Sequence, residues 1–242
     1  MKQTIRYTAL LLALLLCGVL AFTSCNHEKT VGSADEESQI TTERFFPNHE
    51  IKIPEGPEVE PAMAHFMSMQ AKIQFKDVPW GSTPGEITEY MKTQDCLIEE
   101  GLGYIHGKAV LESFYEQSRR GDEGYLKIVH HYPKDEKYPK DEASVYLTLI
   151  YFDGELYHKT SVDANGKTDG GVRSFRYLMH YTGHSENSST SFDYSYYFLT
   201  NDDTITYGQI RYSMYSSNLQ TAMLFFSVSE ICGELTNYVI KE

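Results

Sequence analysis

Histidine is the residue type in this chain with the widest chemistry, and nine are present. His180 and His184 would share one face of a strand, because alternate residues point the same way, and His158 stands on a neighbouring hairpin arm. A zinc site needs three or four such ligands converging on one ion. Nothing in the spacing of these three residues requires convergence. We therefore interpret them as scattered, exposed histidines and expect no metal and no other cofactor.

Acidic residues are the second group with possible chemistry, and several occur as adjacent pairs such as Glu99-Glu100 and Asp202-Asp203. Glycoside hydrolysis needs two carboxylates held several ångströms apart in a cleft, which neighbours on an exposed segment do not provide. The sequence also lacks the nucleophile elbow of hydrolases, the HExxH zinc motif and the glycine-rich phosphate loops. We therefore expect no catalysis. The alternative is a hydrolase of wall polymer or peptide whose site follows no familiar motif.

Three cysteines follow the apolar N-terminal segment: Cys25, Cys96 and Cys232. Cys96 and Cys232 lie far apart in the sequence, so a disulfide between them would close a long loop and constrain the unfolded chain. Thiols outside the cytoplasm often pair in this way. Two separate buried cysteines are an equally good interpretation.

The N-terminal segment has the features of an export signal. Lys2 and Arg6 precede an apolar run from Ala9 to Phe22. The run is shorter than the about 20 apolar residues that a membrane-spanning helix needs, and it has the length of the central part of a signal peptide. Its end, Phe22-Thr23-Ser24-Cys25, resembles the bacterial lipobox, in which the cysteine is acylated.

The resemblance to a lipobox implies a signal peptide over residues 1–24, cleavage before Cys25 and lipid on that cysteine. The mature protein would then be a lipoprotein at a bacterial cell membrane, anchored through Cys25 and facing outside the cytoplasm. Two or three acyl chains hold a protein stably, whereas one holds it only marginally. An ordinary cleaved signal that releases a soluble protein is the alternative.

Net charge excludes one large class of partner. The chain carries a formal charge of −13, and nucleic-acid binding depends on neutralising phosphates with lysine and arginine. The same acidic balance disfavours adsorption to anionic lipid headgroups by charge. We therefore expect no nucleic-acid partner, and contact with the membrane only through the lipid on Cys25.

The composition changes near residue 61. Residues 25–61 are rich in proline and acidic residues, with little periodic hydrophobicity, which indicates a flexible tether. Residues 62–242 carry enough periodic hydrophobicity for one extracytoplasmic domain, since 41% of the whole chain is hydrophobic.

The elements of this domain change in type along the chain. Residues 62–75 form a short amphipathic stretch, Thr83, Pro84 and Glu86 have the spacing of a helix capping box, and a second helix is predicted over 108–120. Strand patterns follow, separated by the hairpin signals Asp153-Gly154 and Asn165-Gly166. The predicted strands cover 125–131, 145–152, 155–162, 172–181, 192–199, 204–215, 222–228 and 234–240. The predicted fold is α+β, with two N-terminal helices packed on a meandering antiparallel β-sheet.

A helix, a glycine, a strand and an Asp-Gly turn follow one another at Phe114, Gly121, residues 125–129 and the pattern Leu149-x-Tyr151-x-Asp153-Gly154. Through these features, residues 104–215 resemble an uncharacterised domain of Gram-positive lipoproteins. No activity is established for that family, so it implies a location and a helix–strand–hairpin arrangement but no catalytic residue.

The strands are rich in tyrosine, which combines apolar area with a polar tip and suits binding surfaces. Tyr194 and Tyr196 would point the same way from one strand and form a possible binding face. A simple preference of tyrosine for strands explains any single one of them equally well. The sequence therefore predicts a non-catalytic binding or scaffold module of the cell envelope, whose partner is an envelope protein, a peptide or a glycan.

Overall fold

The computed structural model describes residues 44–47, 50–100, 104–134, 142–186 and 190–240, and residues 45–242 form one compact unit. The predicted signal peptide, Cys25 and most of the predicted tether lie outside these ranges. No helix among the described residues is long and apolar enough to cross a membrane.

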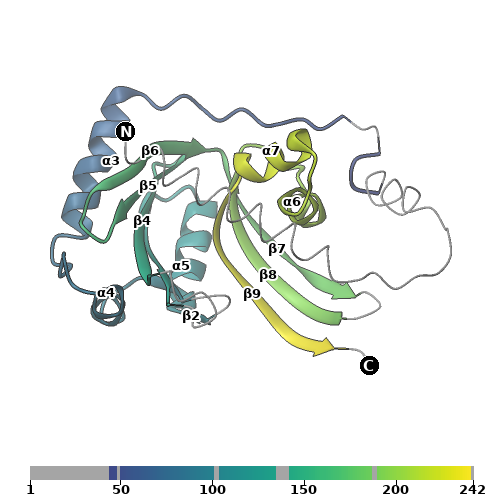
Figure 1. Ribbon diagram of the computed structural model, residues 1–242. Coiled ribbons are helices and arrows are strands. Elements are labelled where there is room, and N and C mark those ends of the chain that lie inside the picture. The colour runs from purple at the N-terminus through teal and green to yellow at the C-terminus, as the bar shows by residue number, and fades with distance from the viewer. Residues whose placement is uncertain (1–43, 48–49, 101–103, 135–141, 187–189, 241–242) are drawn as a thin grey trace. The chain divides into compact units, whose positions relative to one another are not determined.

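Two β-sheets form the framework of this unit (Figure 1). The first sheet has six strands in the order β2-β1-β3-β4-β5-β6, and the second has three in the order β7-β8-β9. All described strand pairs are antiparallel except β1 with β3, which is parallel. The strands are β1 (Leu97–Glu100), β2 (Tyr104–His106), β3 (Gly124–Tyr132), β4 (Ser144–Phe152), β5 (Tyr157–Asp163), β6 (Thr168–Phe175), β7 (Tyr177–Glu186), β8 (Thr190–Thr200) and β9 (Ser229–Ile240).

In the described part of the chain, five helices pack on these sheets. They are α3 (Pro61–Gln74), α4 (Pro84–Met91), α5 (Lys108–Arg119), α6 (Tyr207–Met214) and α7 (Leu219–Ser227). The capping box predicted at Thr83 and Glu86 is confirmed: each side chain accepts a hydrogen bond from the backbone N–H of the other residue. Figure 1 shows α6 and α7 next to the three-stranded sheet.

The predicted fold, two N-terminal helices on one meandering antiparallel sheet, is wrong. The strands divide into two sheets, one strand pair is parallel, and helices α6 and α7 occupy 207–227, where two strands were expected. Isoleucine, tyrosine and phenylalanine favour strands when they are considered alone. Helix caps overrule this preference here, because Thr206 and Gln209 form a second capping box and the Asn218 side chain accepts from two backbone N–H groups.

One predicted strand, 172–181, is in fact two strands. Phe175 ends β6 in the first sheet and Tyr177 begins β7 in the second. Between them, the backbone N–H of Arg176 donates to the Asn201 side chain at 3.1 Å instead of to a strand neighbour. This short break lets consecutive strands belong to different sheets.

Three hydrophobic clusters hold the elements together. The inter-sheet cluster joins one face of the first sheet and α5 to the second sheet, and includes Leu97, Phe114 and Ile231. The α3–α4 cluster covers the opposite face of the first sheet. The α6–α7 cluster packs these helices on the other face of the second sheet and includes Phe198 and Ile210. Leu126 and Val129 of β3 belong to different clusters, so this strand is buried on both faces.

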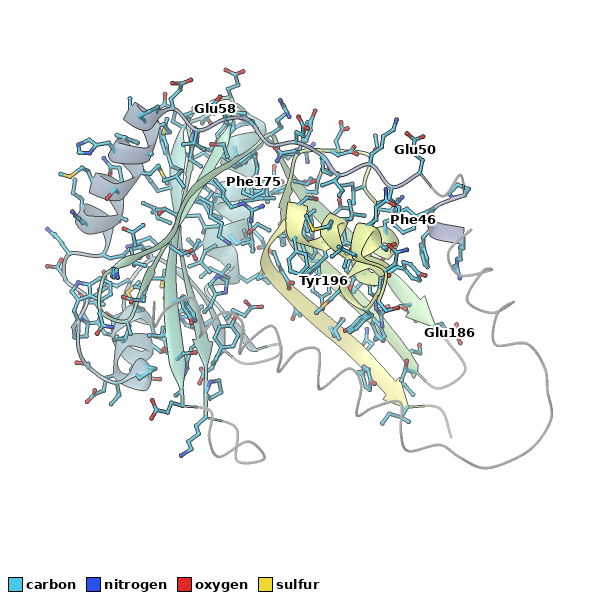
Figure 2. The ribbon with its side chains drawn as sticks, turned by 45° about the horizontal axis from the view of Figure 1, so that its top comes forward. Phe46, Glu50, Glu58, Phe175, Glu186 and Tyr196 are labelled. Carbon is cyan, nitrogen blue, oxygen red and sulfur yellow. The ribbon has the colours of Figure 1, made fainter. Side chains whose placement is uncertain are left out.

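The segment before α3 is part of the compact unit. Phe46 is buried in the α6–α7 cluster, and the backbone oxygen of Phe45 accepts from the Gln209 side chain at 3.0 Å. Farther along, the backbone oxygen of Glu55 accepts from Arg176 at 3.1 Å. Figure 2 shows Glu50 and Glu58 along the extended segment that leads from Phe46 toward α3. The compact unit therefore begins at Phe45, upstream of the boundary at residue 61 that composition indicated.

Candidate functional site

An aromatic groove with a volume of about 510 Å³ lies between helices α6 and α7 and strands β8 and β9. Such a volume is within the range of small-molecule sites in proteins. Figure 2 shows Tyr196 among the side chains of this region. The lining residues are Glu99, Thr190, Phe192, Tyr196, Phe198, Tyr207, Ile210, Arg211, Met214, Tyr215, Phe225, Glu230, Gly233, Leu235 and Tyr238.

Three tyrosines stack beside the aromatic groove, and two of them, Tyr196 and Tyr207, form one of its walls. Alternation along β8 turns Tyr194 and Tyr196 to the same face. Tyr207, the first residue of α6, stacks on both, with ring centroids 4.2 Å from Tyr194 and 5.0 Å from Tyr196. The capping box at Thr206 fixes where α6 begins, and so places the Tyr207 ring over the strand.

Glycines on the neighbouring strands make room for these rings. Tyr196 pairs across the ladder with Gly233 of β9, and Tyr194 pairs with Gly183 of β7. A Cβ atom added at Gly233 would overlap the Tyr196 ring, and one at Gly183 would lie 2.5 Å from the Tyr194 hydroxyl. Each tyrosine ring therefore lies flat across the adjacent strand because its partner has no side chain.

The two tyrosines predicted as a binding face thus lie together, but their surroundings differ. Tyr196 lines the aromatic groove, whereas Tyr194 is not among the lining residues. Tyr194 is only partly exposed, since one side of its ring is covered by Tyr207. Whether they bind a ligand stays a prediction.

Two carboxylates and one guanidinium face the aromatic groove. Glu99 of β1 lies 2.9 Å from Nδ1 of His130, and Arg211 of α6 lies over the Phe192 ring at 5.0 Å while its Nη1 donates to Ser185. Glu230 of β9 is different. Among the described residues its carboxylate makes no hydrogen bond and no ion pair. Burial, and then the charge of Glu99, raise the pKa of Glu230 to about 7.

Lys159 is a cation that acts on Glu230 without pairing with it. Its Nζ donates to the Ser229 hydroxyl at 2.7 Å, one residue from Glu230, and no described ion pair joins the two charged groups. Burial, and then the charge of Arg173, lower the pKa of Lys159 to about 8. A half-buried acid and a half-buried amine therefore act on each other through space, without an ion pair among the described residues.

Replacing Glu230 with glutamine should change how stability depends on pH. The folded-state pKa of about 7 lies above the ordinary value of 4.5, so the folded protein binds the proton more tightly than the unfolded chain. Stability is therefore lost as pH rises from about 4.5 to 7. At pH 8 the Glu230→Gln variant should be more stable than the wild type by up to about 3 kcal/mol, and at pH 4 the difference should disappear. Urea unfolding across this pH range measures the effect.

Glu234→Gln on the same strand is the matched control. Glu234 forms an ion pair with Lys108 at 2.6 Å, so its loss should weaken the protein by about 1 kcal/mol or less at pH 8. Parallel pH profiles for the wild type and the Glu230→Gln variant would contradict the assignment.

Cys96 and Cys232, considered above as a possible disulfide, are free thiols that are buried in different clusters. Cys96 belongs to the α3–α4 cluster, where its thiol donates to the Met91 backbone oxygen, and Cys232 belongs to the inter-sheet cluster. Burial raises the pKa of Cys96 to about 11 and that of Cys232 to about 12. Both are therefore thiols rather than thiolates at neutral pH and are poor nucleophiles.

The three histidines considered as metal ligands do not converge. His158 of β5 is buried, contrary to the expectation of exposed histidines, and binds Asp153 at 2.9 Å and Ser174 at 2.7 Å. His180 and His184 are on β7 in the other sheet, where they bind Ser195 and Asp193. No group of three or more metal-ligating side chains occurs in the part of the chain that the structure describes.

No family model, curated protein or solved structure matches this chain. The resemblance of residues 104–215 to a lipoprotein domain therefore stays a prediction.

The sequence interpretation missed Tyr207, Arg211 and Glu230. The first two lie in a segment that was predicted as a strand, which gave no reason to place them over β8. A signal was present in the charges, because Arg211 is the only charged residue between Asp203 and Glu230. An uncharged, aromatic segment in an acidic protein indicates packing or binding, and Glu230 is the acid that ends it.

Proposed function

We propose that this protein is an extracytoplasmic lipoprotein, held to a bacterial cell membrane by lipid on Cys25, that binds an envelope ligand in the aromatic groove. The ligand is part of an envelope protein, peptide or glycan. The observation that carries the binding role is the stack of Tyr196 and Tyr207 beside the Glu230 carboxylate, which has no ion pair among the described residues. The lipobox resemblance at Cys25 supports the location.

The groove has the properties of a binding site. Seven of its lining residues are aromatic, and together with Ile210, Met214 and Leu235 they offer apolar area for a ligand to cover. Rings that are already stacked lose little conformational freedom when a ligand arrives, which favours affinity. Anchoring at the membrane adds to this by raising the local concentration of the module near envelope ligands.

Tyr196→Ala should weaken ligand binding about tenfold or more. A tyrosine at the centre of an interface often contributes about 2 kcal/mol or more to the free energy of binding. Gly233→Ala should also weaken binding, because the added Cβ displaces the Tyr196 ring without removing it. The measurement is saturable binding of the purified domain to cell-wall fragments and peptide libraries, without turnover.

Tyr125→Ala is the matched control, because Tyr125 is a partly exposed tyrosine that stacks on Tyr151 in the first sheet, outside the groove. This variant should bind like the wild type. Binding that survives Tyr196→Ala and Gly233→Ala unchanged would place the ligand elsewhere and refute the groove as its site.

One observation favours a second function, hydrolysis of wall polymer or peptide. Glu99 and Glu230 face the same groove, and Glu230 has a pKa near neutrality, as a general acid requires. Turnover of wall polymer that disappears in both Glu99→Gln and Glu230→Gln would support this alternative. Saturable binding with no product supports the binding role.

A further inference from the structure

The charges that line the aromatic groove do not balance. Among the described lining residues, Glu99 and Glu230 are acidic, and Arg211 is the one basic residue. Arg211 is held against the Phe192 ring and donates to Ser185, and Lys159 is held by Ser229. Neither cation makes a described ion pair with Glu230. The Glu230 carboxylate thus faces the groove without an ion pair in the described chain, and Lys159 acts on it only through space.

A carboxylate in this position is costly until a cation reaches it, because a half-buried charge loses part of its hydration. The aromatic faces around it also attract cations through their negative quadrupole. A divalent metal fits this groove poorly. Calcium takes about six to eight oxygen ligands, whereas the groove offers two carboxylates among aromatic side chains. An ammonium on an apolar chain matches both the carboxylate and the ring surfaces.

We propose that the groove binds an alkylammonium group, as found in a lysine-type side chain, with the aliphatic chain on the rings of Tyr196 and Tyr207 and the ammonium at Glu230. This inference rests on the proposed binding function and specifies its ligand. Glu99 adds negative charge to the same groove, although His130 already binds one of its oxygens.

Binding should be linked to the release of a proton. Because the pKa of Glu230 is about 7, about half of the free protein carries this proton at pH 7, and the ammonium binds the ionised form. The affinity should therefore rise about tenfold between pH 6 and pH 8, following the ionised fraction of Glu230. The titratable or charged groups near Glu230 are Glu99 on β1, Tyr132 on β3, Lys159 on β5, Tyr196 on β8, Tyr207 and Arg211 on α6, and Cys232 on β9. The tyrosine and cysteine pKa values are raised, so these side chains stay neutral in this window.

The test compares three capped tripeptides, Gly-Lys-Gly, Gly-norleucine-Gly and Gly-Glu-Gly, by titration calorimetry at pH 6 and pH 8. Norleucine keeps the aliphatic chain of lysine but has no ammonium. We expect the lysine peptide to bind about tenfold more tightly than the norleucine peptide at pH 8, and the glutamate peptide not to bind. Hexylammonium tests the other source of the same chemistry, a free amine. Binding as tight as that of the lysine peptide would assign the site to free amines, and weaker binding would assign it to peptides.

Glu230→Gln should abolish both the preference for lysine and its pH dependence, whereas Glu234→Gln, on the same strand but ion-paired with Lys108, should keep both. Thermal melting confirms that each variant is folded. Equal binding of the lysine and norleucine peptides, lost in Tyr196→Ala, would overturn the ammonium site and leave the groove as a binding site. A lysine preference that persists in Glu230→Gln would also overturn it. If neither peptide binds, the ammonium site is refuted, and the wall-fragment experiment separately decides the proposed function.

Discussion

A chain that begins at Pro61 should be less stable than one that begins at Phe45 by about 3–5 kcal/mol, the usual cost of removing a buried phenylalanine. Phe46 is 5% exposed and packs in the α6–α7 cluster, where its ring lies 6.0 Å from that of Tyr212. The shorter chain would also lose the hydrogen bonds that Gln209 and Arg176 donate to this segment. Urea unfolding and a fall in melting temperature of roughly 10 °C would measure the loss.

Phe46→Ala in the full chain separates the side chain from the rest of the segment, and should account for most of the effect. Ile53→Ala is the control, because Ile53 is 40% exposed and its loss should change stability by about 0.5 kcal/mol or less. If the chain starting at Pro61 unfolds at the same urea concentration as the longer one, the segment from Phe45 is not part of the cooperative unit.

The same truncation should destabilise helix α6, which lines the aromatic groove. Phe46 and Ile210 belong to one cluster, and Ile210 lies on α6, which also carries Tyr207 and Arg211. Gln209, the capping-box residue of α6, donates to the Phe45 backbone oxygen. The segment that connects the domain to its predicted tether therefore supports the helix that forms one wall of the site.

Cys25→Ala should move the protein completely from the membrane fraction to the soluble fraction. The apolar run that ends at Phe22-Thr23-Ser24-Cys25 is the motivation. Each buried methylene of an acyl chain contributes about 0.8 kcal/mol to membrane binding. An acidic protein surface has no comparable attraction for the membrane, so it cannot replace two or three lost acyl chains. Detergent-phase partitioning and labelling with a clickable fatty acid are the measurements.

Ser24 provides a second variant at the same site. Small residues precede the acylated cysteine in a lipobox, so Ser24→Glu should impair lipidation while leaving Cys25 in place. Cys96→Ala is the control and should keep the full label, since this thiol is buried. Fatty-acid labelling that persists in Cys25→Ala would refute lipidation at this residue, and a released, unlabelled wild-type protein would favour an ordinary cleaved signal.

Local sequence determined several short-range features of the helices and of the first sheet. The capping residues Thr83 and Glu86, the alternating strand that became β4 and the Asp153-Gly154 turn were all predicted from short-range patterns. Such features depend on neighbours within a few residues, through a backbone hydrogen bond or a preferred turn conformation. For this reason they can be interpreted without knowledge of the rest of the chain.

The α6–α7 segment and the site depended on tertiary structure. Tyr207 has a strand preference in isolation, but Ile210 and Leu224 bury one face of two capped helices against β8. The sequence placed Tyr194 and Tyr196 on a common face, because alternation is local. It could not place Glu230 in the groove with Glu99 and Tyr196, since these residues meet only when β1, β8 and β9 come together from distant parts of the chain. The raised pKa of Glu230 also depends on tertiary structure. Its causes, burial and the charge of Glu99, act through space and cannot be inferred from the order of residues along the chain.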